Sequence, residues 1–277
     1  MTATRSGPDR NEHLLAILRN RVPEVTLVFW IIKVLSTTTG ETFADFLNST
    51  LGFGLTGTTI AMGLLLVALL IAEFSVRRYT PPLFWSVVVV ISIFGTLVTD
   101  NLTDGLGVPL WISTVVFAVL MGGTFAIWYA RERTLSIHSI YTRRREGFYW
   151  VVVLFTFALG TAAGDFIGEA LGLGYWLSLA LFVGLIAAIA VAWRLGLNSV
   201  FCFWAAYVLT RPLGASLGDL LSSPKSDGGL GLGTTVTSVT FLVAIVALVI
   251  YLTVKVRAER RAAETIEDDL PDLVDAV

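Results

Sequence analysis

The stretch that decides the fold is FWIIKVLSTTTGETFADFL, residues 29–47, because the chain repeats its pattern three more times. The copies are FWSVVVVISIFGTLVTDNL (84–102), YWVVVLFTFALGTAAGDFI (149–167) and FWAAYVLTRPLGASLGDLL (203–221), and all four align without gaps. Every copy has a tryptophan, then a glycine ten residues later and an aspartate five residues after that: Trp30, Trp85, Trp150 and Trp204; Gly40, Gly95, Gly160 and Gly214; Asp45, Asp100, Asp165 and Asp219. Four identical spacings indicate that each copy is one repeated structural unit.

The composition is that of a membrane protein. Of the 277 residues, 55% are hydrophobic and 14% are charged, whereas a soluble domain usually carries about 25% charged residues. Four uncharged stretches, 46–72, 105–130, 170–193 and 228–254, each exceed the roughly 20 residues that a helix needs to cross a bilayer. The sequence therefore predicts an all-α, multi-pass integral membrane protein.

The apolar pattern predicts eight transmembrane helices, at about 25–47, 56–75, 82–101, 109–130, 148–168, 174–193, 199–221 and 233–254. Of the 19 basic residues, 16 lie in the N-terminal segment, in alternate connections and in the C-terminal segment. Basic residues accumulate on the cytoplasmic side of a membrane protein. Both termini are therefore expected in the cytoplasm, and the protein in the bacterial inner membrane.

Each repeat contains a motif helix, which carries the Trp–Gly–Asp pattern, followed by a plain helix. Because two helices return the chain to its starting side, all four repeats are expected to be parallel and to form a pseudo-fourfold bundle. Motif helices are expected inside and plain helices toward lipid. The expected organisation is a cytoplasmic N-terminal arm (1–24), a membrane domain (25–254, with repeats at about 25–78, 80–134, 145–195 and 199–255) and a cytoplasmic tail (255–277).

The repeated pattern resembles a bacterial integral membrane family built from four tandem two-helix repeats, each with a characteristic tryptophan. The resemblance covers about residues 25–255. It implies the topology and the repeat, and the activity has to be argued from the residues themselves.

Charged residues in the motif helices are the candidates for function. Tryptophans prefer the membrane interface, and an aspartate fifteen residues further lies about 22 Å along the helix. Lys33, Glu41 and Arg211 then fall well inside the membrane, where a charge must face the bundle interior or a watery cavity. Gly40 and Pro212 are places where the motif helices are expected to unwind and expose carbonyls.

The carboxylates and hydroxyls on the inner stripes form the expected ion path, because residues four apart share a helix face. Oxygen ligands of this kind suit hard cations such as Mg²⁺, Ca²⁺ or Mn²⁺. The predicted ion-binding residues are Glu41, Asp45, Asp100, Asp165, Asp219, Thr37, Thr96 and Thr161, with Glu41 and Asp45 as the metal ligands. Lys33 and Arg211 are expected to balance charge and to act as gates.

The most concrete function is a secondary transporter of a small cation, such as a proton-coupled exporter of a divalent metal resembling Mn²⁺. The alternatives are a passive cation channel, a carrier of a small solute or anion bound by Lys33 and Arg211, and a structural or signalling membrane protein. The sequence has no phosphate-binding loop, His/Cys cluster or hydrolase motif, so no enzyme activity and no cofactor is expected. The expected partners are the lipid bilayer and the cation, and not nucleic acid.

Overall fold

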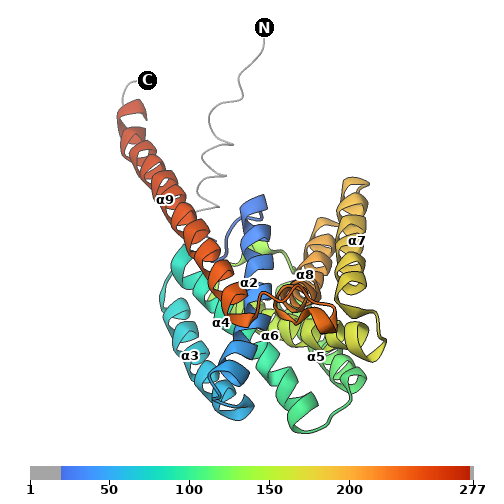
Figure 1. The fold of residues 1–277 in the computed structure, drawn as a ribbon. Coiled ribbons are helices and arrows are strands. Elements are labelled where there is room, and N and C mark those ends of the chain that lie inside the picture. Colours follow the sequence, from blue (N-terminus) through green and yellow to red (C-terminus); the bar gives the residue numbers. More distant parts are fainter. Residues whose placement is uncertain (1–19, 275–277) are drawn as a thin grey trace.

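The computed structural model describes residues 20–274. Residues 1–19, most of the expected N-terminal arm, and residues 275–277, the end of the expected tail, lie outside the described residues. Within residues 20–274 the chain forms eight long helices and no strand (Figure 1). They are α2 (Leu27–Asp45), α3 (Leu55–Ser75), α4 (Pro81–Asp100), α5 (Leu110–Glu132), α6 (Arg143–Asp165), α7 (Gly174–Arg194), α8 (Ser199–Ser222) and α9 (Thr234–Val274).

Seven of these helices, α3 to α9, are long and apolar enough to cross a membrane, so the chain has the build of a multi-pass membrane protein. The eighth predicted span, α2, is not among them. This helix carries Lys33, Glu41 and Asp45 together with a run of hydroxyl side chains, and these residues lower its hydropathy. Most of the polar residues in α2 are nevertheless buried, because other helices surround it.

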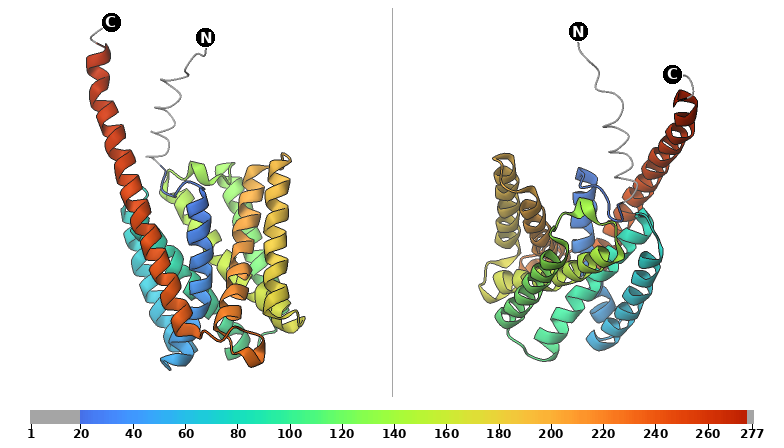
Figure 2. Two further views of the ribbon diagram at one scale, coloured as in Figure 1. Left: turned by 45° about the horizontal axis from the view of Figure 1, so that its top comes forward. Right: turned by 180° about the vertical axis from the view of Figure 1, so that it is seen from behind.

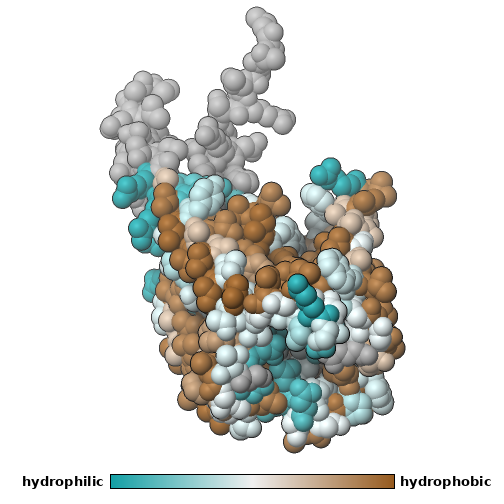
Figure 3. Space-filling view, viewed as in Figure 1, coloured by the Kyte–Doolittle hydropathy of each residue, from teal (hydrophilic) through white to brown (hydrophobic). Residues whose placement is uncertain are grey.

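The helices form an inner and an outer set. In the most apolar part of α3, α5, α7 and α9, 11% of the residues are buried, against 50% to 72% in α4, α6 and α8. The motif helices contact one another in a closed ring, α2 to α4, α4 to α6, α6 to α8, and α8 back to α2. Apolar residues cover most of the face shown in Figure 3, with hydrophilic residues gathered in a few patches.

Each plain helix packs on the motif helix of the next repeat. Helix α3 packs on α4, α5 on α6 and α7 on α8. The last plain helix, α9, packs on the first motif helix, α2, and extends well beyond the other helices (Figure 2). The fourth repeat therefore covers the first.

The aromatic pairs that begin the motif helices pack together at one end of the bundle, called here the tryptophan end. The first aromatic of each repeat contacts the tryptophan of the next, with ring centroids 5.2 to 6.1 Å apart: Phe29 and Trp85, Phe84 and Trp150, Tyr149 and Trp204, and Phe203 and Trp30. Trp85, Trp150 and Trp204 are 1%, 3% and 6% exposed. These three tryptophans form the core between repeats and do not face outward as interfacial anchors.

The repeated glycines set the spacing of the inner ring. Each lies against the residue three positions before the glycine of the next repeat. A Cβ added at the glycine would come within 2.5 to 2.7 Å of the neighbour's Cβ in the pairs Gly40 and Ser92, Gly95 and Phe157, Gly160 and Arg211, and Gly214 and Thr37. Real Cβ atoms do not approach so closely, so the helices can contact at this distance only because the position has no side chain.

Three motif helices change from α to π geometry immediately after the shared aspartate. The π segments are Phe46–Thr50, Asn101–Gly105 and Phe166–Ala170, which follow Asp45, Asp100 and Asp165. The unwinding expected at Gly40 and Pro212 is not present: α2 and α8 are continuous there. The Pro212 ring packs closely on α6, since a Cβ at Gly160 would lie 3.0 Å from it. The irregular backbone instead begins directly after the aspartates. Short π-helical segments occur frequently at functional sites.

Candidate functional site

Arg211 lies at the centre of the inner ring and is bound by all the other motif helices. Its side chain is fully buried. Nη1 donates to the carbonyl oxygen of Thr37 at 2.7 Å, and Nε donates to Oγ1 of Thr161 at 3.1 Å. Nη2 donates to Oε2 of Glu41 at 2.7 Å, to Oγ1 of Thr161 at 2.8 Å, and to Oγ1 of Thr96. One residue of the fourth repeat thus links the other three.

The predicted threonine ligands therefore bind the guanidinium. Thr96 and Thr161 offer their hydroxyl oxygens to Arg211, whereas Thr37 offers its backbone carbonyl and donates its own hydroxyl to Val34 at 2.6 Å. The Glu41 partner is 8% exposed. Removing one member of such a buried pair leaves an uncompensated charge, at a cost of about 3–5 kcal/mol.

Three of the predicted carboxylates meet beside this ion pair. Glu41 and Asp45 lie one helical turn apart on α2, and Asp219 comes from α8. One carboxylate oxygen from each lies within 4.8 Å of the other two. The close approach of the two helices allows this, because Gly218 of α8 lies directly against α2: a Cβ there would be 3.4 Å from that of Glu41. Asp45 and Asp219 are half-buried.

The other two shared aspartates occupy different places. Asp100 of α4 is half-buried and its charge interacts with those of Glu41, Asp45 and Arg211. Asp165 of α6 is also half-buried and has its own interactions. Within the described residues, the group whose oxygens lie within 4.8 Å contains neither of them. The repeat supplies four equivalent aspartates, and the structure assembles two of them with Glu41.

Lys33 lies apart from the carboxylates, toward the tryptophan end. It is fully buried, and its Nζ has no hydrogen-bond partner among the described residues. The ammonium lies 3.7 Å from the centre of the Phe157 ring and 4.2 Å from that of Tyr207. The Arg211 guanidinium approaches the same Phe157 ring at 6.0 Å. Two buried cations therefore share one aromatic ring, and cation–π attraction partly replaces hydration.

Several buried hydroxyls of the inner ring were not predicted as site residues. Ser36 and Thr39 of α2 are fully buried, and neither hydroxyl has a hydrogen-bond partner within residues 20–274. The run STTT at 36–39 was the available signal, but a threonine in a helix commonly bonds its own backbone. Only the packing of α2 against α8 and α4 shows which hydroxyls of this run lie in the inner ring without a partner.

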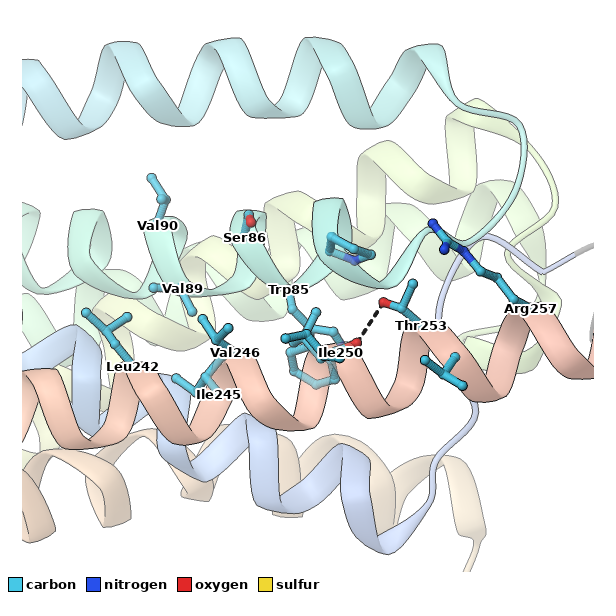
Figure 4. A pocket seen from close by; sticks show the side chains of 13 residues that line it. Trp85, Ser86, Val89, Val90, Leu242, Ile245, Val246, Ile250, Thr253 and Arg257 are labelled. Atoms are coloured by element: carbon cyan, nitrogen blue, oxygen red, sulfur yellow. Dashed lines mark hydrogen bonds between the residues drawn. The ribbon is translucent and has the colours of Figure 1, made fainter.

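A groove of about 570 Å³ on the side of the bundle lies between α4 and α9 (Figure 4). Apolar side chains such as Val89 and Ile245 line most of it, and Arg257 lies at one end. None of the predicted ion-binding residues lines this groove. The candidate site is therefore the inner ring.

Comparison with known protein families identifies a family of repeats. The family described as "Repeat of Unknown Function (DUF347)" matches the chain four times in tandem, at residues 28–79, 83–134, 148–195 and 202–258. No curated protein and no solved structure matches the chain. The four matches cover most of the chain and contain all four Trp–Gly–Asp patterns. The chain therefore belongs to the DUF347 family of tandem repeats.

Proposed function

We propose that this protein is a secondary transporter of a small divalent cation in the bacterial inner membrane. The observation that carries the proposal is the group formed by Glu41, Asp45 and Asp219, whose oxygens lie within 4.8 Å of one another. Oxygen ligands bind Ca²⁺ at 2.3–2.6 Å and Mg²⁺ at 2.0–2.1 Å. Oxygens on opposite sides of such an ion lie about 4–5 Å apart, so small side-chain movements suffice to enclose one.

The neighbouring arginine supports a carrier with exchange between two states. In the described arrangement the Arg211 guanidinium forms an ion pair with Glu41 and hydrogen bonds to the other motif helices. An entering cation competes with this tethered guanidinium for the same carboxylate. A bound ion releases Arg211, and loss of the ion restores the pair. An arginine spanning the centre supports a carrier more than a permanently open channel, and it has few donors left for an anion.

The contacts between successive repeats support the predicted symmetry. The same glycine contact, aromatic contact and plain-helix contact recur from each repeat to the next and from the fourth to the first. Parallel repeats about a pseudo-fourfold axis have this pattern. With basic residues concentrated in alternate connections, both termini are assigned to the cytoplasm and the aspartates to the outer half of the membrane.

Transport assays on purified protein in proteoliposomes test the proposal. We expect Mn²⁺ flux from wild type, loss of flux in Glu41→Gln, and at least tenfold weaker apparent Mn²⁺ affinity in Asp219→Asn. Asp227→Asn is the matched control, because Asp227 is exposed and lies in the connection after α8. Thermal stabilisation by Mn²⁺, Mg²⁺ and Ca²⁺ is measured on the same preparations. Wild-type flux in Glu41→Gln, or no stabilisation of wild type by any of the three ions, would overturn the proposal.

A further inference from the structure

A second pair of buried carboxylates lies at the tryptophan end. Glu73, in the last turn of α3, is 4% exposed, and Glu146, in the first turn of α6, is 1% exposed. Arg21, which precedes α2, is 8% exposed and forms an ion pair with Glu146. The charges of Glu73, Glu146 and Arg21 interact with one another. None of these residues belongs to the carboxylate group around Glu41.

The backbone around Arg21 is fixed in this place. The Arg21 amide donates to the carbonyl of Ile140 at 3.1 Å, and the Asn20 side chain donates to the carbonyl of Ile137 at 3.1 Å. The Tyr79 amide donates to the carbonyl of Asn20 at 3.3 Å. The segment before α2 is thus bonded to the connection before α6 and to the one before α4. These bonds fix the backbone of Arg21, and so keep its guanidinium beside Glu146.

The charges at this point do not balance. Glu146 accepts a hydrogen bond from Arg21, whereas Oε2 of Glu73 has no hydrogen-bond partner among the described residues. An ionised carboxylate that is buried and unpaired costs several kcal/mol. Within residues 20–274, the other groups near the pair are the hydroxyls of Tyr79 and Tyr149, the Trp150 indole, the exposed Arg143, and Arg260 of α9, whose Nη2 donates to the Tyr79 carbonyl.

Among the described residues, these surrounding groups do not supply the missing positive charge, since Arg260 donates to the Tyr79 carbonyl and has further interactions of its own. Burial raises the pKa of the Tyr79 hydroxyl, which accepts from the indole of Trp85, so this group stays neutral. Arg143 faces solvent, where water and salt screen its charge. In the part of the chain that the structure describes, two buried carboxylates therefore depend on one buried guanidinium. Like charges that share a site are relieved when one of them takes up a proton.

We propose that Glu73 and Glu146 form a proton-binding site that holds one shared proton. Through this site, protons for transport enter the protein at the tryptophan end. Proton binding itself does not depend on the cation site, whereas its role in coupling rests on the function proposed above. The proton comes from solvent, converts one carboxylate to a carboxylic acid, and leaves by the reverse step. This proton is the coupling ion of the proposed transporter.

Buried polar side chains lie between this site and the central ion pair. Tyr149 follows Glu146 by one turn on α6, and its ring contacts that of Trp204, which contacts Tyr207 on α8. The hydroxyls of both tyrosines are buried and have no hydrogen-bond partner among the described residues. The Tyr207 ring in turn lies against Lys33. Glu146 and Thr161 are fifteen residues apart on α6, a distance of about 22 Å. The two sites are therefore separate, and protonatable groups lie between them.

Infrared spectroscopy of the full protein in lipid tests proton binding without any transport. A protonated carboxyl has a C=O band distinct from that of a carboxylate and shifts in D₂O. At neutral pH we expect the wild-type spectrum to contain this band and both Glu73→Gln and Glu146→Gln to lose the same component, because either variant leaves one carboxylate for Arg21. Arg21→Gln is expected to double this component. The exposed Glu259→Gln should match wild type. A component that persists in both glutamine variants, or is unchanged in Arg21→Gln, would contradict the shared proton.

Proteoliposome measurements test the coupling role. Glu73→Gln is expected to retain wild-type stabilisation by Mn²⁺, since the ion site is intact, while proton movement per Mn²⁺ transported falls at least tenfold. Unchanged proton movement in this variant refutes the coupling role. If wild type transports no cation while the infrared component behaves as expected, the proposed transport function fails and the proton site stands.

Discussion

Gly160 of α6 lies directly against Arg211 of α8, so that a Cβ at position 160 would come within 2.5 Å of the arginine Cβ. This contact brings the arginine stem to the axis of the ring, and Nη2 then reaches Thr161, the residue after the glycine, at 2.8 Å. The same contact elsewhere in the ring presents Thr37, Ser92 or Phe157 in the place of Arg211. The repeated glycines thus position residues that the repeats do not share.

Gly160→Ala should destabilise the protein. The added methyl group must displace the stem of Arg211, and overpacking of this kind costs about 1–3 kcal/mol. Gly122→Ala on α5 is the matched control, because nothing lies within 4 Å of a Cβ at that position and alanine favours a helix over glycine by up to about 1 kcal/mol. Thermal unfolding in detergent measures both. Equal melting temperatures for the two variants would contradict the close contact.

Arg211→Met should be more harmful to stability than the loss of the ion pair itself. The variant leaves Glu41 buried without its guanidinium, at a cost of about 3–5 kcal/mol. The double variant Glu41→Gln/Arg211→Met removes both charges and should recover most of that loss. The double-mutant cycle, read by thermal unfolding, gives the coupling energy between the two residues. Additive effects would show that the pair contributes nothing.

Asp219→Asn and Asp165→Asn should differ although both positions are equivalent in the repeat. Asp219 lies with Glu41 and Asp45, and Asp165 is not in that group. Loss of an ion ligand should weaken Mn²⁺ affinity at least tenfold in Asp219→Asn, with less than a threefold change in Asp165→Asn. Isothermal titration calorimetry of the two variants measures this. Equal losses would favour four equivalent ligands around the axis.

Lys33→Met should stabilise the protein. Burying an ammonium costs several kcal/mol, and a cation–π contact returns about 2 kcal/mol, so the burial cost is the larger effect. Methionine keeps most of the volume against Phe157 and Tyr207, which lie within 4.2 Å of the ammonium. The melting temperature is expected to rise by several degrees. A fall would show that the charge is compensated in the fold.

The fourfold Trp–Gly–Asp spacing predicted the repeat, and the charged and hydroxyl residues of the motif helices predicted their inner position, because such groups are costly in contact with lipid. The spacing could not reveal the neighbours of each residue. Trp85 is placed at the interface by its amphipathic ring, yet its indole bonds Tyr79 in the core at 3.0 Å. That outcome depends on aromatic partners from another repeat, which local sequence does not contain.

The candidate site was predictable to a similar extent. Glu41, Lys33 and Arg211 stand out because charges inside a membrane helix are costly. Asp219 joins Glu41 and Asp45, and Asp165 does not, because α8 approaches α2 closely at Gly218. This approach cannot be read from a single sequence. Glu73 and Glu146 were missed, since each lies near a helix end where a surface role is usual.

The order of packing has a consequence for biosynthesis. Helix α2 carries Lys33 and Glu41 and is covered by α8 and α9, which are synthesised after the other described helices. Until they arrive, Lys33 and Glu41 lack their partners on α8. The first of the eight described helices is therefore the last of them to be enclosed by its neighbours, and a chain truncated before α9 should be retained by membrane quality control.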